Sequence, residues 1–393
     1  MFRGFIYVLR PTQEQACQFG QFAGVCRLVW NLALEQRRNH WRQYQAFTGN
    51  NLNYVTQARE LTMLRAEVDF VRDVCQSCQQ RTLKALDEAY RRAWKGMGGY
   101  PQPKRKGVND AFSFAGREVK VEKINRRWGR IKLPKIGWVK FRMSRPIEGS
   151  IREATVTCTA LGWQVSIGCL IDRTVADNGK NVGIDRGIAV PLMLSDGTAF
   201  VMPVNLAVVD RKARKAQRVA SRRKRGSVRG AKAQRRAAKL KAKVARIRKH
   251  WAHESTTAIT RNYGTVVVER LRTKNMTASA AGTLAAPGKN VAQKRGINRA
   301  ILNVGWHQVE TMLAYKAANL IKVNPAYTSQ TCSSCGTVDS RSRKSQAIFA
   351  CQHCGYRDNA DRNAAVNILY RGNTPGVEPI LWGGDEARTI QVA

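Results

Sequence analysis

The segment CSSCGTVDSRSRKSQAIFACQHCGYRDNADRNAAVNIL, residues 332–369, decides how the second half of the chain is organised. It holds two Cys-x-x-Cys pairs separated by fifteen residues, and Gly336 or Gly355 follows each pair, where a tight turn favours a positive φ. Zinc takes four tetrahedral ligands, and each pair can hold one side of the ion. The sequence therefore predicts a zinc ribbon over residues 328–357 with one structural Zn²⁺. Its four ligands are Cys332, Cys335, Cys351 and Cys354.

A third Cys-x-x-Cys pair, Cys75 and Cys78, lies in a run with helical periodicity. A redox motif has one such pair, whereas the ribbon has two at metal-ligand spacing. Because Cys75 and Cys78 have no second pair near them in sequence, we expect small, packed side chains there. A second metal site is the alternative.

Three acidic residues stand at the ends of predicted elements around the ribbon. Asp185 ends the apolar strand NVGID, Glu269 ends the strand YGTVVVE, and Asp361 opens the helix DRNAAVNIL. Each alone fits an ordinary strand-end or helix-capping acid. Together they can converge, and carboxylate oxygens suit Mg²⁺. Two Mg²⁺ ions roughly 3.5–4 Å apart hydrolyse phosphodiesters; we expect Asp185 to bridge both ions, and Glu269 and Asp361 to complete one each.

The charge balance of the chain indicates which class of molecule it binds. The chain has 68 Lys and Arg against 27 Asp and Glu, a net charge of +41, in 393 residues. Such a field attracts polyanions and opposes compaction unless phosphates neutralise it, so we expect a nucleic-acid partner. A ribosomal or membrane-surface protein shares this balance. With 43% hydrophobic residues, the chain has enough apolar material for two or three folded domains.

Residues 211–250 hold 19 Lys and Arg and no acid. Apolar residues keep helical spacing on both sides of Gly226 and Gly230, which favours a helical hairpin with basic outer faces over a disordered tail. We expect this hairpin to follow a phosphate backbone.

The first half predicts a strand over residues 2–9, helices over residues 12–95, and then β alternation after the Gly- and Pro-rich segment 96–107. The expected later strands contain residues 112–114, 131–133, 139–141, 154–159 and 163–167. This order predicts a small barrel or sheet interrupted near its start by a helical block. After residue 296, apolar spacing from Ile301 to Leu313 predicts one further helix.

The sequence shows no signal peptide and no apolar run of about 18 residues, which favours a cytoplasmic protein and no membrane partner. In a reducing compartment the ten cysteines serve as thiols or metal ligands rather than disulfides.

The motifs GIDRG, VVVERL, CSSCG with CQHCG, and NADRNAAVNI, in that order, resemble the three RuvC motifs and the zinc module of TnpB proteins. LRPTQEQ, VWNLALEQ, LKALDEAYRRAW, YPQPKRKG and GWHQVETMLAYKA match as well, so that the resemblance covers roughly residues 1–370. TnpB proteins are encoded by transposable elements and resemble ancestors of type V CRISPR effectors.

The resemblance implies an α+β multidomain fold. It consists of a β-barrel wedge domain with a helical insertion, and an RNase H-like (RuvC) α/β domain that carries the zinc ribbon. The implied domains are a wedge domain of residues 1–11 and 96–176, a helical recognition lobe of residues 12–95, a RuvC domain of residues 177–327 and 358–370, the ribbon, and a C-terminal tail of residues 371–393.

The resemblance also implies an activity, namely RNA-guided endonuclease cleavage of double-stranded DNA. The implied guide RNA comes from the end of the protein's own element, and one protein copy binds one RNA. Asp185, Glu269 and Asp361 occupy the catalytic positions of the family. Tyr54 and Gln80 lie in segments that resemble the reader of the motif flanking the target. The basic residues of the segment that resembles an RNA contact are Lys104, Arg105 and Lys106.

Other functions remain as alternatives. A nuclease-inactive, RNA-guided DNA-binding repressor has the same scaffold but tends to lose these acids. A compact type V CRISPR effector shares the motifs, although the short helical lobe favours TnpB. A strand-joining transposase and a zinc-ribbon RNA-binding protein without catalysis are more distant alternatives.

Overall fold

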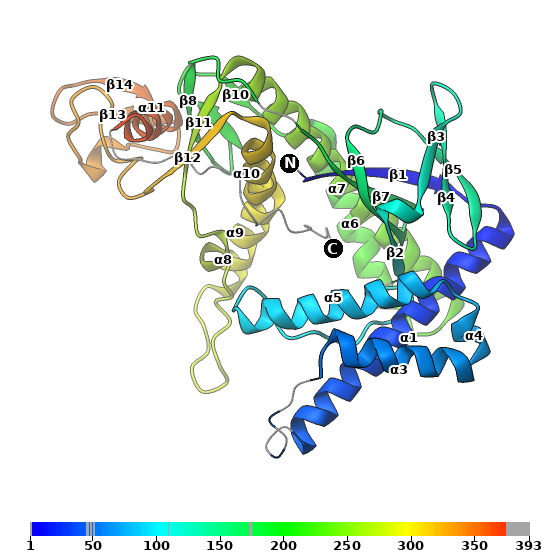
Figure 1. The fold of residues 1–393 in the computed structure, drawn as a ribbon. Helices are drawn as coiled ribbons and strands as arrows, with labels where there is room; N and C mark the ends of the chain where they lie inside the picture. Colours follow the sequence, from blue (N-terminus) through cyan, green and yellow to red (C-terminus); the bar gives the residue numbers. More distant parts are fainter. Residues whose placement is uncertain are drawn as a thin grey trace. The chain divides into compact units, whose positions relative to one another are not determined.

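The structure is a computed structural model that describes residues 2–44, 47, 49, 52–108, 110–172 and 175–374. Much of the predicted C-terminal tail, residues 375–393, lies outside these residues. The chain divides into two compact units, Met1–Asp172 and Arg173–Ala393 (Figure 1). Each unit has its own sheet and its own hydrophobic clusters.

The first unit is built on a seven-stranded antiparallel sheet in the order β2-β6-β7-β1-β5-β4-β3. Its strands are β1 (Phe2–Arg10), β2 (Ala111–Ala115), β3 (Lys120–Lys123), β4 (Trp128–Leu133), β5 (Gly137–Arg142), β6 (Ser150–Thr159) and β7 (Gly162–Leu170), with a 3₁₀ turn at Gly116–Glu118. The predicted strands are confirmed. Among the described residues no ladder joins β2 to β3, so closure into a barrel stays a prediction.

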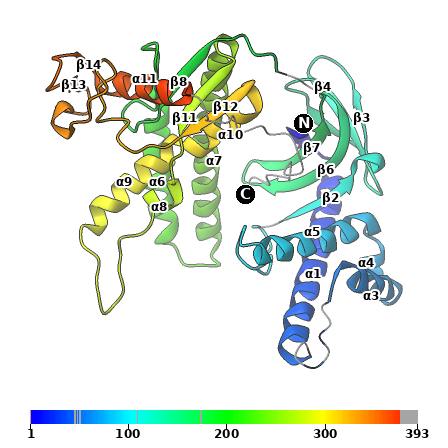
Figure 2. The same cartoon turned by 60° about the vertical axis from the view of Figure 1, so that its left-hand side comes forward.

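Helices fill the interval between β1 and β2, as the sequence predicts. They are α1 (Gln13–Gln43), α3 (Tyr54–Glu67), α4 (Asp69–Arg72) and α5 (Gln76–Trp94). Thr12 and Gln15 form a capping box that starts α1 directly after Pro11. Phe19 and Phe22 of α1 then pack on Phe112 of β2, with ring centroids 5.6 and 5.3 Å apart. Helices and sheet thus share one core, and Figure 2 shows α1 and α5 beside β2.

The second unit is built on a mixed five-stranded sheet in the order β10-β9-β8-β11-β12. Its strands are β8 (Asn181–Asp185), β9 (Leu192–Leu194), β10 (Ala199–Phe200), β11 (Thr265–Glu269) and β12 (Asn319–Val323). β8, β11 and β12 are parallel, whereas β9 and β10 run antiparallel at one edge. All five residues of β11 are buried, which explains its continuous apolar run.

Helices cover both faces of this sheet. Trp251 of α7 and Leu313 of α10 pack with Ile184 and Val266 on one face. On the other face, Ile368 of α11 packs with Val267 of β11 and with Ile321 and Val323 of β12. The unit's helices are α6 (Val204–Ser221), α7 (Val228–Asn262), α8 (Thr273–Met276), α9 (Val291–Val304), α10 (Trp306–Lys316) and α11 (Ala360–Gly372). A 3₁₀ turn (Ser340–Ser342) and the hairpin β13 (Ile348–Ala350) with β14 (Arg357–Asn359) lie between β12 and α11.

The predicted basic hairpin is confirmed as α6 and α7, with Leu206, Ala213 and Val244 buried along their seam. α7 is longer than predicted, because its C-terminal half continues to Asn262 and covers the sheet. The prediction of a single helix from Ile301 to Leu313 is wrong. Gly305, at φ 75°, ends α9 and begins α10, and this left-handed conformation interrupts the helix.

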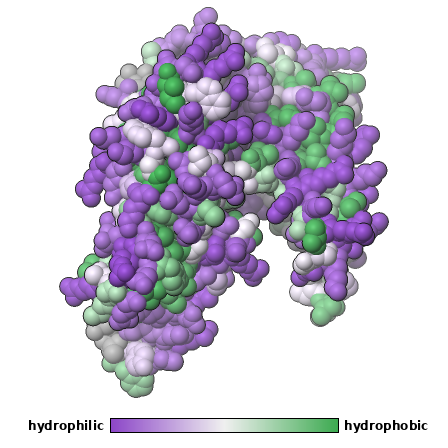
Figure 3. Space-filling view, turned by 90° about the vertical axis from the view of Figure 1, so that its right-hand side faces the viewer, coloured by the Kyte–Doolittle hydropathy of each residue, from purple (hydrophilic) through white to green (hydrophobic). Residues whose placement is uncertain are grey.

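The face of the molecule in Figure 3 is dominated by hydrophilic side chains, as the charge of the chain requires. Within the described part of the chain, no helix combines the length and the apolar character needed to cross a membrane.

Candidate carboxylate site and four-cysteine cluster

The sheet of the second unit brings two of the predicted acids to one edge. Asp185 is the last residue of β8, and Glu269 is the last residue of β11. The two strands are parallel, and Ile184 lies opposite Val268. The next position on each strand therefore carries an acid, at the carboxyl end of the sheet where neighbouring strands finish together.

The third acid comes from the helix that packs on β8. Gly183 contacts the backbone of α11 so closely that an added Cβ would lie 2.2 Å from the Ala365 carbonyl oxygen. Asp361 stands four residues before Ala365, one helical turn nearer the end of β8. Asn359 caps α11 by accepting the N–H groups of Asp361 and Arg362. The glycine of the GIDRG motif thus permits the approach that places Asp361 beside the strand ends.

The electrostatics of the three acids show that they interact. Burial, together with the negative charges of Glu269 and Asp361, raises the pKa of the Asp185 carboxyl to about 7. Burial also raises the pKa of Asp361, against the opposing charge of Arg343. The oxygens are nevertheless spread more widely than metal ligands around one ion. In the described residues, only the four-cysteine group brings three or more possible ligand atoms within 4.8 Å of one another.

A buried arginine links the two strand ends. Arg186, which follows Asp185 and is 5% exposed, donates to the main-chain carbonyl of Glu269. Its guanidinium also pairs with Glu310 of α10 at 2.8 Å, and Lys322 of β12 pairs with the same glutamate. This network fixes the main chain on which the two acids stand.

Arg343 is a residue of the site that sequence reasoning missed. Its guanidinium lies 3.3 Å from Asp361 Oδ1, and it comes from the segment between the two cysteine pairs. Its positive charge also opposes the rise in the pKa of Asp185. The side chain keeps 28% of its surface exposed, so that it can contact an anion as well as the carboxylate. No pattern distinguishes it from the other basic residues of SRSRKS; only the fold does.

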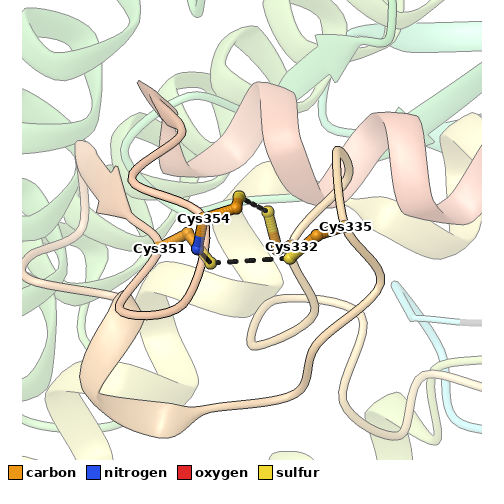
Figure 4. A group of neighbouring side chains, drawn as sticks. All are labelled: Cys332, Cys335, Cys351 and Cys354. Carbon is orange, nitrogen blue, oxygen red and sulfur yellow. Dashed lines mark hydrogen bonds between the residues drawn. The ribbon is translucent and has the colours of Figure 1, made fainter.

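The four predicted cysteines meet in one cluster, with their side chains pointing toward one another from two loops (Figure 4). The Sγ atoms of Cys332 and Cys354 are 3.7 Å apart, as are those of Cys335 and Cys351. Zinc–sulfur bonds of about 2.3 Å in a tetrahedron place sulfurs about 3.8 Å apart. These thiols therefore have the spacing of a tetrahedral zinc shell, which is far longer than a disulfide bond.

The third cysteine pair lies across the start of a helix, whereas the sequence placed both cysteines within a helical run. Cys75 is the N-cap residue of α5, and Cys78 lies in its first turn. Cys78 is fully buried in the core of the first unit, as expected of a packed thiol. A hydrogen bond from Cys78 lowers the pKa of the half-buried Cys75 thiol to about 5.

The five candidate nucleic-acid contacts lie in the first unit. They differ from one another in their exposure and in the side chains that they contact. Tyr54 begins α3, and its ring faces Lys84 Nζ at 5.1 Å, one turn along α5 from Gln80. Lys104 is partly buried, with Nζ 4.0 Å from the ring centroid of Trp30. Burial lowers the pKa of this lysine. Arg105 and Lys106 are exposed. Contact with nucleic acid stays a prediction for all five.

Three family models match parts of the chain. They are described as "Cas12f1-like, TNB domain" at residues 306–368, "Probable transposase" at residues 164–280, and "Helix-turn-helix domain" at residues 1–46. The last of these segments forms β1 and α1 in the structure. The first contains the whole cysteine cluster and Asp361.

A relative from Escherichia coli (strain K12), "Putative RNA-guided DNA endonuclease InsQ", is 36% identical over 380 residues, which cover 94% of this chain and 92% of the relative. The chain belongs to the TnpB family. A second relative, "Putative RNA-guided DNA endonuclease" from Streptomyces pristinaespiralis, is 31% identical over 382 residues. The match covers 94% of this chain and 89% of the relative. The TnpB likeness therefore extends through both structural units.

The fold of this TnpB-family chain also resembles a solved structure, described as "Cryo-EM structure of the Cas12f1-sgRNA-target DNA complex". The TM-score is 0.55 at 16% identity, and the match covers 93% of this chain and 84% of that one. The likeness supports a mixed α/β architecture of the Cas12f kind.

Proposed function

We propose that this chain is an RNA-guided DNA endonuclease of the TnpB type, and that its second unit contains an RNase H-like (RuvC) nuclease domain. The observation that carries the proposal is the grouping of Asp185, Glu269 and Asp361, whose burial and mutual repulsion raise the pKa of Asp185 to about 7. Perturbed acids grouped in this way are typical of functional sites. Family membership supports the activity, because the two relatives described above, which match nearly the whole chain, are named as putative RNA-guided DNA endonucleases.

The three acids would hold Mg²⁺, and the donor set fits that ion. Carboxylate oxygens are the hard ligands that Mg²⁺ prefers, and a divalent cation offsets the repulsion between them. Two bound Mg²⁺ ions would supply an activated water and stabilise the leaving oxygen in phosphodiester hydrolysis. Because the charges of both Glu269 and Asp361 act on Asp185, this acid would help to hold both ions.

The remaining groups of the site orient the acids and the substrate. Arg186 holds the main chain at Glu269, and Asn359 fixes the first turn of α11. Arg343, partly exposed beside Asp361, is placed to bind an oxygen of the scissile phosphate. The four cysteines would hold one Zn²⁺ with a complete tetrahedral shell, so that this ion is structural.

Sequence specificity comes from a guide RNA transcribed from the end of the protein's own transposable element. The protein holds the RNA–DNA heteroduplex by its backbone, while base pairing supplies the sequence. The +41 net charge, concentrated in part on α6 and α7, provides the attraction for phosphates. Tyr54 and Gln80 would read the flanking motif, and Lys104, Arg105 and Lys106 would contact RNA, in a complex of one protein with one RNA in the cytoplasm.

The test uses the full chain co-expressed with the RNA of its flanking locus. We expect the purified complex to cut, in Mg²⁺, a plasmid library that carries the matched target beside a randomised flank. Asp185→Ala should reduce the cleavage rate by at least about 10³-fold while RNA still copurifies. Sequencing the copurified RNA should give one locus-derived species.

Each other outcome points to a different function. A complex that binds the matched target without cutting would be a guided repressor. Covalently joined products would indicate a strand-transfer enzyme. A mixture of cellular RNA, with no cutting of the matched target, would contradict RNA guidance.

A further inference from the structure

The carboxylate of Glu269 is held by a buried hydroxyl. Thr328, which is 2% exposed, has its hydroxyl 2.5 Å from Glu269 Oε1 and 3.0 Å from the Pro325 carbonyl, and its single proton goes to the nearer, charged acceptor. A hydrogen bond to a charged acceptor is shorter and stronger than one between neutral groups. One oxygen of Glu269 therefore has a fixed partner, which sets the orientation of the whole carboxylate.

The place of Thr328 follows from the strand beside β11. β12 pairs with β11 in parallel, and Glu269 lies opposite Val323, the last residue of β12. A turn follows at once, in which the Thr328 N–H donates to the Pro325 carbonyl and Tyr327 has φ 62°. The turn leads the chain back over the end of β11. Thr328, the last residue of the turn, therefore contacts Glu269, the last residue of β11.

Two buried asparagines of α11 clamp the segment that follows this turn. Asn367 Nδ2 donates to the carbonyls of Thr328 at 2.9 Å and Thr331 at 2.7 Å. Asn363 Nδ2 donates to Thr331 O at 2.8 Å, and its Oδ1 accepts the Ser333 N–H at 2.9 Å. Buried amides require such partners. Residues 328–333 are thus fixed along one side of α11.

This clamp connects the two parts of the site. Thr331 and Ser333 are the neighbours of Cys332, the first cysteine of the cluster. Asp361 stands at the start of the helix that carries both asparagines. One continuous set of hydrogen bonds therefore runs from Ser333, the neighbour of Cys332, through the asparagines of α11 and Thr328 to Glu269.

We propose that Thr328 is a positioning residue for the metal-binding carboxylate of Glu269, and that Asn363 and Asn367 connect it to the four-cysteine cluster. The inference rests on the proposed function, since it takes Glu269 as a metal ligand. Groups that hydrogen-bond a metal ligand orient it, and their loss commonly lowers metal affinity by roughly 10- to 100-fold. Packing alone would affect stability but would leave the metal affinity unchanged.

The experiment measures Mn²⁺ binding to the full chain with its guide RNA, by the loss of the free-ion signal in electron paramagnetic resonance. Thr328→Val keeps the shape of the side chain and removes the hydroxyl, so Mn²⁺ should bind about 10- to 100-fold more weakly. Thr328→Ser restores the hydroxyl and should bind nearly as wild type. The matched control is Thr311→Val, because the Thr311 hydroxyl donates to the His307 carbonyl within α10 rather than to an acid; it should bind Mn²⁺ as the wild type does.

A second series tests the connection. Asn367→Asp keeps the shape of the side chain but loses both donors; it should weaken Mn²⁺ binding while the zinc content stays at one ion per chain. In a Glu269→Gln background, Thr328→Val should have no further effect on Mn²⁺ affinity. This comparison decides the matter even where a single variant is less stable.

Three results would overturn the inference. One is wild-type Mn²⁺ affinity in Thr328→Val together with a lower melting temperature, which would indicate packing alone. Another is a Thr328→Val substitution that weakens Mn²⁺ binding equally in the wild type and in the Glu269→Gln background. The third is an Asp185→Ala complex that binds Mn²⁺ as tightly as the wild-type complex. If Mn²⁺ binds with the expected dependence on Thr328 but DNA is not cut, the endonuclease proposal fails and the positioning role stands.

Discussion

The four-cysteine cluster and the carboxylate site are both candidate metal sites, but they are assembled in opposite ways. The cysteines come from one short segment, and two tight turns bring their sulfurs to within 4.8 Å of one another. The acids come from two strands and a helix that are far apart in the sequence. Their geometry depends on strand register and on the contact of α11 with Gly183.

The difference teaches which forces set each site. Four soft thiolates around zinc can drive local folding, because metal binding and folding are one event in such modules. Three like charges work against folding, and surrounding packing has to hold them together. We therefore expect the cluster to unfold when it loses a zinc ligand. We expect the carboxylate site to lose cleavage activity after small shifts in the packing around it.

The largest effect should come from breaking the cluster. Cys351→Ser should abolish zinc binding and unfold the loops that carry Arg343 and residues 328–333, so cleavage should fall below detection. Elemental analysis and limited proteolysis measure both results. Cys158→Ser, which changes an exposed thiol outside the cluster, is the control and should keep zinc and activity. A folded, active Cys351→Ser variant would show that the carboxylate site does not need the cluster.

A second, smaller effect should come from separating α11 from β8. Gly183→Ala adds a methyl group where only 2.2 Å is available beside the Ala365 carbonyl, so that the helix has to move and take Asp361 with it. A displacement of about 1 Å at a catalytic site can lower the rate by about 10²-fold. The measurement is the cleavage rate, with the zinc content expected to be unchanged.

The matched control is Gly296→Ala, since a methyl group at that position of α9 meets no atom within 4 Å. It should retain full cleavage. Equal activity of the two variants would mean that the site tolerates movement of the helix.

The smallest effect concerns the repulsion between the acids in the absence of divalent metal. The pKa of Asp185 is raised to about 7 in the folded chain, against about 3.9 in an unfolded one. Between these values the folded state binds more protons, so the free energy of unfolding falls as pH rises. Asp185→Asn removes this loss and should melt a few degrees above the wild type at pH 8 but not at pH 4.

Thermal melts in chelator at the two pH values test this prediction. Adding Mg²⁺ at pH 8 should raise the melting temperature of the wild type and leave that of Asp185→Asn nearly unchanged. An advantage of the variant that is the same at both pH values would contradict a raised pKa.

Sequence alone predicted those parts of the site that local patterns determine. Regular cysteine spacing indicated the cluster, and apolar runs that end in an acid indicated Asp185 and Glu269. Arg343 and Thr328 could not be predicted, because nothing local distinguishes them and their partners lie on other elements. The split at Gly305 was missed because apolar spacing continues across it. Lys104 looked like a surface cation, yet its ammonium lies on Trp30.

The central position of β1 in its sheet has a consequence for how the chain is made. This first strand has β5 and β7 as its two neighbours. When β1 leaves the ribosome, neither of its partner strands has been made. The longer of its two pairings, with β7, cannot form until synthesis passes Leu170. At about 5–20 residues per second, this interval lasts on the order of 10–30 s. Helices α1, α3, α4 and α5 can form during that time from local contacts, so we expect the helical block to fold before the sheet closes around β1.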